Sequence, residues 1–150
     1  MYYCPTNQIK WINLIFCSVS GIWNIEYRKV HSVKKYKGIG AGEFIKALND
    51  KYVMFDYSAE LSSGRGSAHA IFAWDEKVKM YKFWWFEDSG SFMTATCNFI
   101  NEDILHLSWH DSLLIQTFSK VDPNRIVLRM EHPSSEEKYE LILEVIFTRE

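Results

Sequence analysis

The clearest structural signal in this chain is the stretch SFMTATCNFINEDILHLSWH, residues 91–110. Apolar and polar residues alternate on both sides of the polar turn at 101–103, as they do in strands with one buried face. With Asn98 opposite His106, one face of the hairpin is wholly polar and the other is mainly apolar. The polar face then pairs Thr96 with Ser108 and Thr94 with His110, and the apolar face pairs Cys97 with Leu107, Ala95 with Trp109 and Phe99 with Leu105. A shift of one residue would mix the two faces, so the pattern predicts this register.

The same alternation extends over the rest of the chain from Gly21. Turn-forming residues separate short apolar-rich segments, and no segment with helical periodicity interrupts them. The predicted strands are 22–30, 39–48, 51–60, 66–74, 78–86, 91–100, 104–110, 112–119, 125–132 and 138–149. Their predicted inward side chains include Trp23, Ile25, Tyr27, Val53, Phe55, Tyr57, Ala68, Ala70, Phe72, Tyr81, Phe83, Trp85, Leu113, Ile115, Thr117, Ile126, Leu128, Met130, Tyr139, Leu141, Leu143, Val145 and Phe147. The sequence therefore predicts an all-β fold, an antiparallel up-and-down β-barrel of about 8–10 strands, because closure removes the free edges of a sheet.

The first 20 residues have a different pattern. Thr6 can cap a helix over residues 6–20. Its apolar positions recur at helical spacing and are Ile9, Ile12, Phe16 and Val19. We expect this short N-terminal helix to lie at one end of a barrel formed by residues 21–149, so that 1–150 is a single domain. The alternative is a signal peptide over residues 9–20, where a lysine precedes a short apolar run.

Composition and charge exclude several classes of protein. The chain has 150 residues, of which 47% are hydrophobic, and this is enough for a buried core. The net charge of −2 argues against a nucleic-acid-binding protein, and the lack of an apolar run of roughly 20 residues argues against a membrane span. Three widely spaced cysteines without a CxxC pair indicate free thiols. Free thiols are typical of a reducing compartment, so we expect a cytoplasmic protein, or an exported one if the signal-peptide alternative holds.

Three motifs that resemble catalytic or binding sites have simpler structural explanations. His106 and His110 would lie roughly 13 Å apart on a strand, which is too far to share one metal ion. His110, Asp111 and Ser112 are consecutive and cannot point at one another as a catalytic triad requires. The glycines at 38–42 lack the following helix and the Lys-Ser/Thr of a phosphate-binding loop, and in a strand they mark a bend. We therefore expect no catalytic residue, no metal and no cofactor.

The start of the first strand resembles a known family. Gly21-Ile22-Trp23 is similar to the G-x-W signature of the lipocalins and their calycin-type barrel relatives. This resemblance implies that Trp23 lies at the closed end of the barrel and that an arginine from the last strand packs over it. Arg149 is the matching residue of this chain, and a cation–π contact would let the two residues close the barrel.

Four further motifs resemble, in the same order, those of a bacterial lipocalin-like family of unknown function. They are Gly40-Ala41-Gly42-Glu43-Phe44, Asn49-Asp50-Lys51-Tyr52-Val53, Trp74-Asp75 and Phe86-Glu87-Asp88-Ser89-Gly90. This resemblance covers roughly residues 21–149 and implies the same barrel, although Trp74 stands where the family pattern has a tyrosine.

The aromatic inward face indicates that the barrel binds a small hydrophobic or aromatic molecule, because aromatic walls with a few polar groups are the usual composition of such a site. The residues expected to bind it are Tyr27, Phe55, Tyr57, Phe72, Phe83, Trp85, Trp109 and His132. His132 has inward parity opposite Tyr139 and would be a polar anchor at the barrel mouth. Haem is disfavoured, because the last strand, 138–149, has no histidine to act as the axial ligand found in nitrobindin-like barrels.

Two alternatives stay open at this point. The barrel can have a filled interior and serve a structural or interaction role, or it can be an enzyme that uses a Tyr/His cluster as acid and base. Trp84 and Phe86 have outward parity beside Met80, and an apolar patch there predicts a homodimer. The basic stretch 28–37 is expected to be a solvated connector.

Overall fold

The computed structural model describes residues 21–31, 34–49, 51–61, 64–134 and 138–149, and for 21–39 and 61 it describes the backbone alone. These residues form ten strands, which are β1 (Gly21–His31), β2 (Lys34–Ala47), β3 (Tyr52–Leu61), β4 (Gly64–Asp75), β5 (Met80–Glu87), β6 (Phe92–Asn101), β7 (Ile104–Trp109), β8 (Ile115–Asp122), β9 (Arg125–Pro133) and β10 (Tyr139–Arg149). The helix or signal peptide expected within residues 6–20 lies outside this described part.

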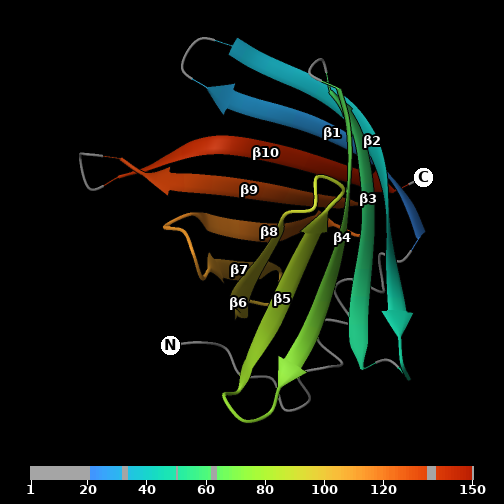
Figure 1. Ribbon diagram of the computed structural model, residues 1–150, viewed down its shortest axis with the longest axis vertical. Coiled ribbons are helices and arrows are strands. Elements are labelled where there is room, and N and C mark those ends of the chain that lie inside the picture. The colour runs from blue at the N-terminus through green and yellow to red at the C-terminus, as the bar shows by residue number, and fades with distance from the viewer. Residues whose placement is uncertain (1–20, 32–33, 50, 62–63, 135–137, 150) are drawn as a thin grey trace.

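The strands close into one barrel (Figure 1). Each described strand is hydrogen-bonded to its neighbour in the sequence, and β1 completes the ring by pairing antiparallel with β10. This arrangement confirms the predicted all-β, up-and-down antiparallel fold. Within the described residues, no helix has the length and hydropathy needed to cross a membrane.

The predicted register of the β6–β7 hairpin is confirmed. Asn98 lies opposite His106, and the apolar face pairs Cys97 with Leu107. The polar face extends one step further, because Thr94 Oγ1 lies 2.8 Å from His110 Nδ1. Strict alternation of polar and apolar residues on both strands is what fixes this register.

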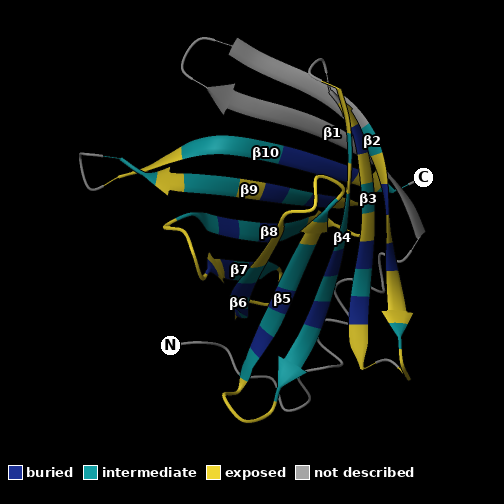
Figure 2. Ribbon diagram, viewed as in Figure 1, coloured by how far each residue is buried: buried dark blue, intermediate teal, exposed yellow. Residues whose placement is uncertain are grey.

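The barrel interior is tightly packed at the end where the β2–β3, β4–β5, β6–β7 and β8–β9 turns lie (Figure 2). Phe44 stacks on Phe55 with ring centroids 4.2 Å apart, and Phe147 meets both rings edge-on. Phe72 and Phe83 pack together with their centroids 4.6 Å apart. All five of these side chains are at most 1% exposed, and they belong to one continuous hydrophobic core.

The predicted parity of β8 is wrong. Leu113, expected inside, is 74% exposed in the β7–β8 turn, whereas Gln116 and Phe118 are buried. Gln116 lies opposite Leu107 on β7, and His106 is paired with Thr117. Ile115 and Thr117, also expected inside, are only partly buried.

The predicted parity at the start of β10 is also wrong, because a β-bulge interrupts its pairing with β9. The register shifts between Leu141 and Leu143, so Tyr139 lies opposite Pro133 and is 52% exposed. His132 therefore faces Glu140 and not Tyr139, and its side chain is exposed. A bulge adds one residue to one strand and reverses its parity on one side, which a single strand pattern does not reveal.

Candidate functional site

The other half of the barrel interior is hollow. A cavity of about 510 Å³ lies at the end of the barrel where the β5–β6 and β7–β8 turns lie. Side chains from β3 to β10 line it, and most of them are apolar or aromatic. Phe55 and Phe147 belong both to this lining and to the packed core, so the filled half of the barrel forms the floor of the cavity.

Four of the eight side chains predicted to bind a ligand line this cavity. They are Phe55, Tyr57, Trp85 and Trp109. Tyr57 lies on β3 and Trp85 on β5, the two strands that flank β4, and their ring centroids are 5.9 Å apart inside the barrel. Trp109 is 8% exposed and its ring centroid is 5.5 Å from that of Phe83.

The other predicted binding residues lie elsewhere or outside the description. Phe72 and Phe83 share the inward parity but sit deeper, in the packed half, where Phe72 also contacts Phe118 at a centroid distance of 6.1 Å. His132 is exposed and is not part of the cavity lining. The side chain of Tyr27 lies outside the described residues.

The proposed barrel-closing pair is placed by the backbone alone. The register of β1 and β10 puts Trp23 directly opposite Arg149. The side chain of Trp23 lies outside the described part of the chain, so the cation–π contact stays a prediction.

The sequence reasoning missed two polar groups on the cavity wall. Gln116 is 2% exposed and lines the cavity, although its strand was expected to turn this position outward. Trp109 was expected in the site for its ring, but its indole Nε1 is also buried and has no hydrogen-bond partner among the described residues. The length of the β7–β8 turn is the feature that would have placed Gln116 correctly.

Two acidic residues missed as site residues lie at the cavity mouth, Glu87 at the end of β5 and Asp88 in the turn that follows. Glu87 Oε1 accepts a hydrogen bond of 3.0 Å from Trp85 Nε1, and Asp88 Oδ2 accepts two from Ser67, from its backbone nitrogen at 2.8 Å and its hydroxyl at 3.0 Å. Both carboxylates line the cavity, and neither forms an ion pair with a described side chain. The Asp88-Ser89-Gly90 motif marked this turn, but the sequence pattern did not relate it to a cavity.

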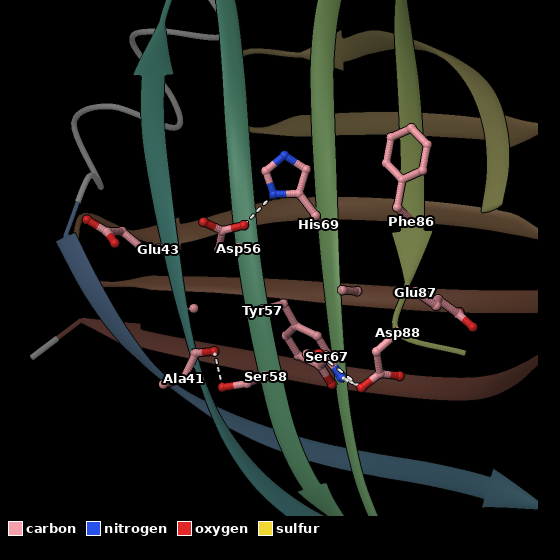
Figure 3. A pocket seen from close by; sticks show the side chains of 12 residues that line it. Ala41, Glu43, Asp56, Tyr57, Ser58, Ser67, His69, Phe86, Glu87 and Asp88 are labelled. Atoms are coloured by element: carbon pink, nitrogen blue, oxygen red, sulfur yellow. Dashed lines mark hydrogen bonds and ion pairs between the residues drawn. The ribbon is translucent and has the colours of Figure 1, made fainter. Parts of the chain in front are cut away.

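A second hollow, of about 650 Å³, lies on the outer face of β2 to β5 (Figure 3). Glu43, Asp56, His69 and Phe86 are successive cross-strand partners there. The carboxylate of Asp56 contacts His69 Nδ1, and Figure 3 shows the two side chains reaching toward each other across neighbouring strands. No group of three or more described His, Cys, Asp or Glu side chains is arranged to hold a metal ion.

Cys97 is the described cysteine, and it lies in the packed half of the barrel. Burial raises the pKa of its thiol, so the reactive thiolate is suppressed. This environment is that of a structural cysteine and not of a nucleophile.

Comparisons with known proteins identify a fold but no family. No protein-family model and no curated protein matches the chain. The chain is similar in structure to an S-type phycobiliprotein lyase, CPES from Guillardia theta, with a TM-score of 0.62 and 11% identity over 97% of this chain and 98% of that chain. It is also similar to a de novo designed fluorescence-activating β-barrel, with a TM-score of 0.49 and 13% identity over 87% of this chain and 93% of that chain. The likeness to the lyase supports the barrel fold that the lipocalin resemblance implies, and no family model supports the resemblance to the bacterial lipocalin-like family.

Proposed function

We propose that this protein binds a small hydrophobic or aromatic molecule inside its barrel. The observation that carries the proposal is the cavity of about 510 Å³ with aromatic walls, which lies within the usual range of about 300–1,000 Å³ for small-molecule sites. The likeness to the phycobiliprotein lyase supports this proposal only in that the two chains share a barrel fold.

The size of the cavity sets the expected affinity. A two-ring aromatic ligand that buries about 250 Å² of apolar surface gains about 6 kcal/mol at about 25 cal/mol per Å². Loss of translational and rotational freedom opposes this gain, so we expect dissociation constants in the micromolar to millimolar range for simple aromatic probes. A natural ligand that fills the cavity better would bind more tightly.

The hollow half of the barrel also bears on the two alternatives. A structural barrel with a filled interior would need the cavity side of Trp85 and Trp109 to be packed, and both line empty space. The enzyme alternative used a Tyr/His cluster as acid and base, and His132, the histidine predicted for the site, lies outside the cavity lining. A homodimer through the exposed Phe86, and a cytoplasmic location, stay predictions that the cavity does not address.

The proposal is tested by filling the cavity with a side chain. Ala59 is 7% exposed and lines the cavity, so Ala59→Phe should block it. Ala73→Phe is the matched control, because Ala73 lies on the outer face of β4 between Tyr52 and Lys82. The probe is N-phenyl-1-naphthylamine, whose fluorescence rises in an apolar environment.

We expect saturable binding of the probe by the unmodified protein and by Ala73→Phe, and at least tenfold weaker binding by Ala59→Phe. Circular dichroism establishes that each variant keeps its barrel. Absence of saturable binding by the unmodified protein would refute the proposal, and equal binding by the two variants would place the probe outside this cavity.

A further inference from the structure

The wall of the cavity formed by β7 and β8 contains an unused hydrogen-bond donor. Trp109 is more than nine-tenths buried, it lines the cavity, and its Nε1 has no hydrogen-bond partner among the described residues. Buried indole N–H groups almost always have a partner. A donor left without one beside an apolar cavity is therefore a position at which a ligand acceptor is recognised.

Gln116 adds a second polar group to the same wall. Its strand pairs with that of Trp109, where Leu107 lies opposite Gln116, and its side chain is 2% exposed and lines the cavity. A side-chain amide can donate and accept, so it can hydrogen-bond the same ligand group or an adjacent one. Two polar groups on one wall amid aromatic side chains fix the orientation of a ligand as well as its affinity.

The charges around the cavity all have one sign in the described part of the chain. Glu87 and Asp88 lie at the mouth, and no described Lys, Arg or His side chain belongs to the lining. An anionic ligand would approach these two carboxylates, and like charges repel one another. A neutral or cationic ligand meets no such barrier.

The geometry points to a ligand class that deepens the proposed function and rests on it. The cavity takes neutral or cationic aromatic molecules that carry a carbonyl or ring-nitrogen acceptor, which accepts a hydrogen bond from Trp109 Nε1, and it rejects anionic ones. Fatty-acid-like carboxylates therefore do not bind in the cavity, although they are similar in size and hydrophobicity to the ligands that do.

The acceptor is tested with 9-fluorenone and fluorene, which have nearly the same shape and differ by one carbonyl. Each competes with N-phenyl-1-naphthylamine for the unmodified protein and for Trp109→Phe. Burial alone favours fluorene, because the fluorenone carbonyl loses its hydrogen bonds with water. We expect the unmodified protein to prefer fluorenone, and the fluorenone-to-fluorene affinity ratio to fall at least fivefold in Trp109→Phe.

Comparing the ratio in the two proteins removes the effect of the smaller phenylalanine ring, because both ligands experience it. A preference of the unmodified protein for fluorene would overturn the role of Trp109 Nε1. This outcome needs no variant, so it stands even if Trp109→Phe does not fold.

The charge preference is tested with a second matched pair. 8-Anilinonaphthalene-1-sulfonate is N-phenyl-1-naphthylamine with one sulfonate added. We expect the neutral probe to bind at least tenfold more tightly at low salt, and the difference to shrink in 0.5 M NaCl and in the double variant Glu87→Gln with Asp88→Asn.

Equal or tighter binding of the sulfonate would overturn the charge preference. Failure of every probe to bind, the neutral one included, would instead refute the proposed function itself.

Discussion

Two glycine-to-alanine substitutions on the same rung of the barrel should change stability in opposite directions. Gly40 on β2 and Gly66 on β4 both lie opposite Ala59, one on each side of β3. A Cβ atom at Gly40 would collide with the carbonyl oxygen of Ser58 and lie 3.0 Å from the Ala59 Cα. These are backbone atoms, which cannot rotate away. A Cβ atom at Gly66 has no heavy atom within 4 Å.

The expected magnitudes follow from these contacts. Gly40→Ala forces β2 and β3 apart and should lower the free energy of unfolding by about 1–3 kcal/mol, as overpacking does. Gly66 is not among the described glycines with positive φ, which are Gly64 and Gly90. Gly66→Ala therefore fits its backbone and should raise the free energy of unfolding by about 0.4–1 kcal/mol, because alanine restricts the unfolded chain.

Urea unfolding followed by tryptophan fluorescence measures both effects. The two variants should move the midpoint in opposite directions at an unchanged m value, which shows that the unfolding transition exposes the same surface. The reasoning is refuted if Gly40→Ala is as stable as the unmodified protein, or if Gly66→Ala is the less stable variant. Either outcome would mean that β2 and β3 are not in the close contact described.

Three further outcomes are expected. In the same urea assay, Phe72→Ala should lower the free energy of unfolding by about 3–5 kcal/mol and Trp85→Ala by less than about 2 kcal/mol. The difference is expected because, of the two side chains, only Phe72 is enclosed on all sides. Equal losses would contradict a hollow half of the barrel. The hydrogen bond from Lys82 lowers the pKa of Asp75 below its ordinary 3.8. The stability contributed by this pair is therefore present above pH 3.8 and lost as the pH falls through the lower pKa of the folded protein. When the free energy of unfolding is measured from pH 5 to pH 2, Lys82→Met should lose part of this pH dependence. Cys97 should resist alkylation in the folded protein at pH 8 and react fully in urea, as read by peptide mass spectrometry, and rapid labelling without denaturant would disprove its enclosure.

The sequence predicted the barrel because most strands obey a strict alternation. The β6–β7 hairpin is the clearest case, since moving Thr96 or His106 inward would also move Cys97 and Leu107 outward. At the start of β8, Ile115 and the preceding Leu114 are both apolar, so two parities fit the sequence about equally well. The structure resolves the choice through the preceding turn, which a local pattern does not encode.

The cavity depends on a property that alternation does not contain. Phe83 and Trp85 share an inward parity on β5, yet Phe83 is fully buried in the packed half and Trp85 lines the cavity. Their depth in the barrel is set by the stagger and tilt of all the strands together. Inward residues could therefore be predicted one strand at a time. Predicting which regions of the interior are filled and which are hollow requires the geometry of the whole barrel.

Closure through β1 and β10 has a consequence for how the protein folds. Every other pairing among the described strands joins neighbours in the sequence and can form as a local hairpin, but this one joins Trp23 to Arg149. Such a distant contact forms late and slowly, because the chain between the two strands must already be ordered or its loop entropy lost. Until then β1 and β10 expose unpaired backbone, so the slowest step of folding is also the one at which two nascent chains can join edge to edge and aggregate.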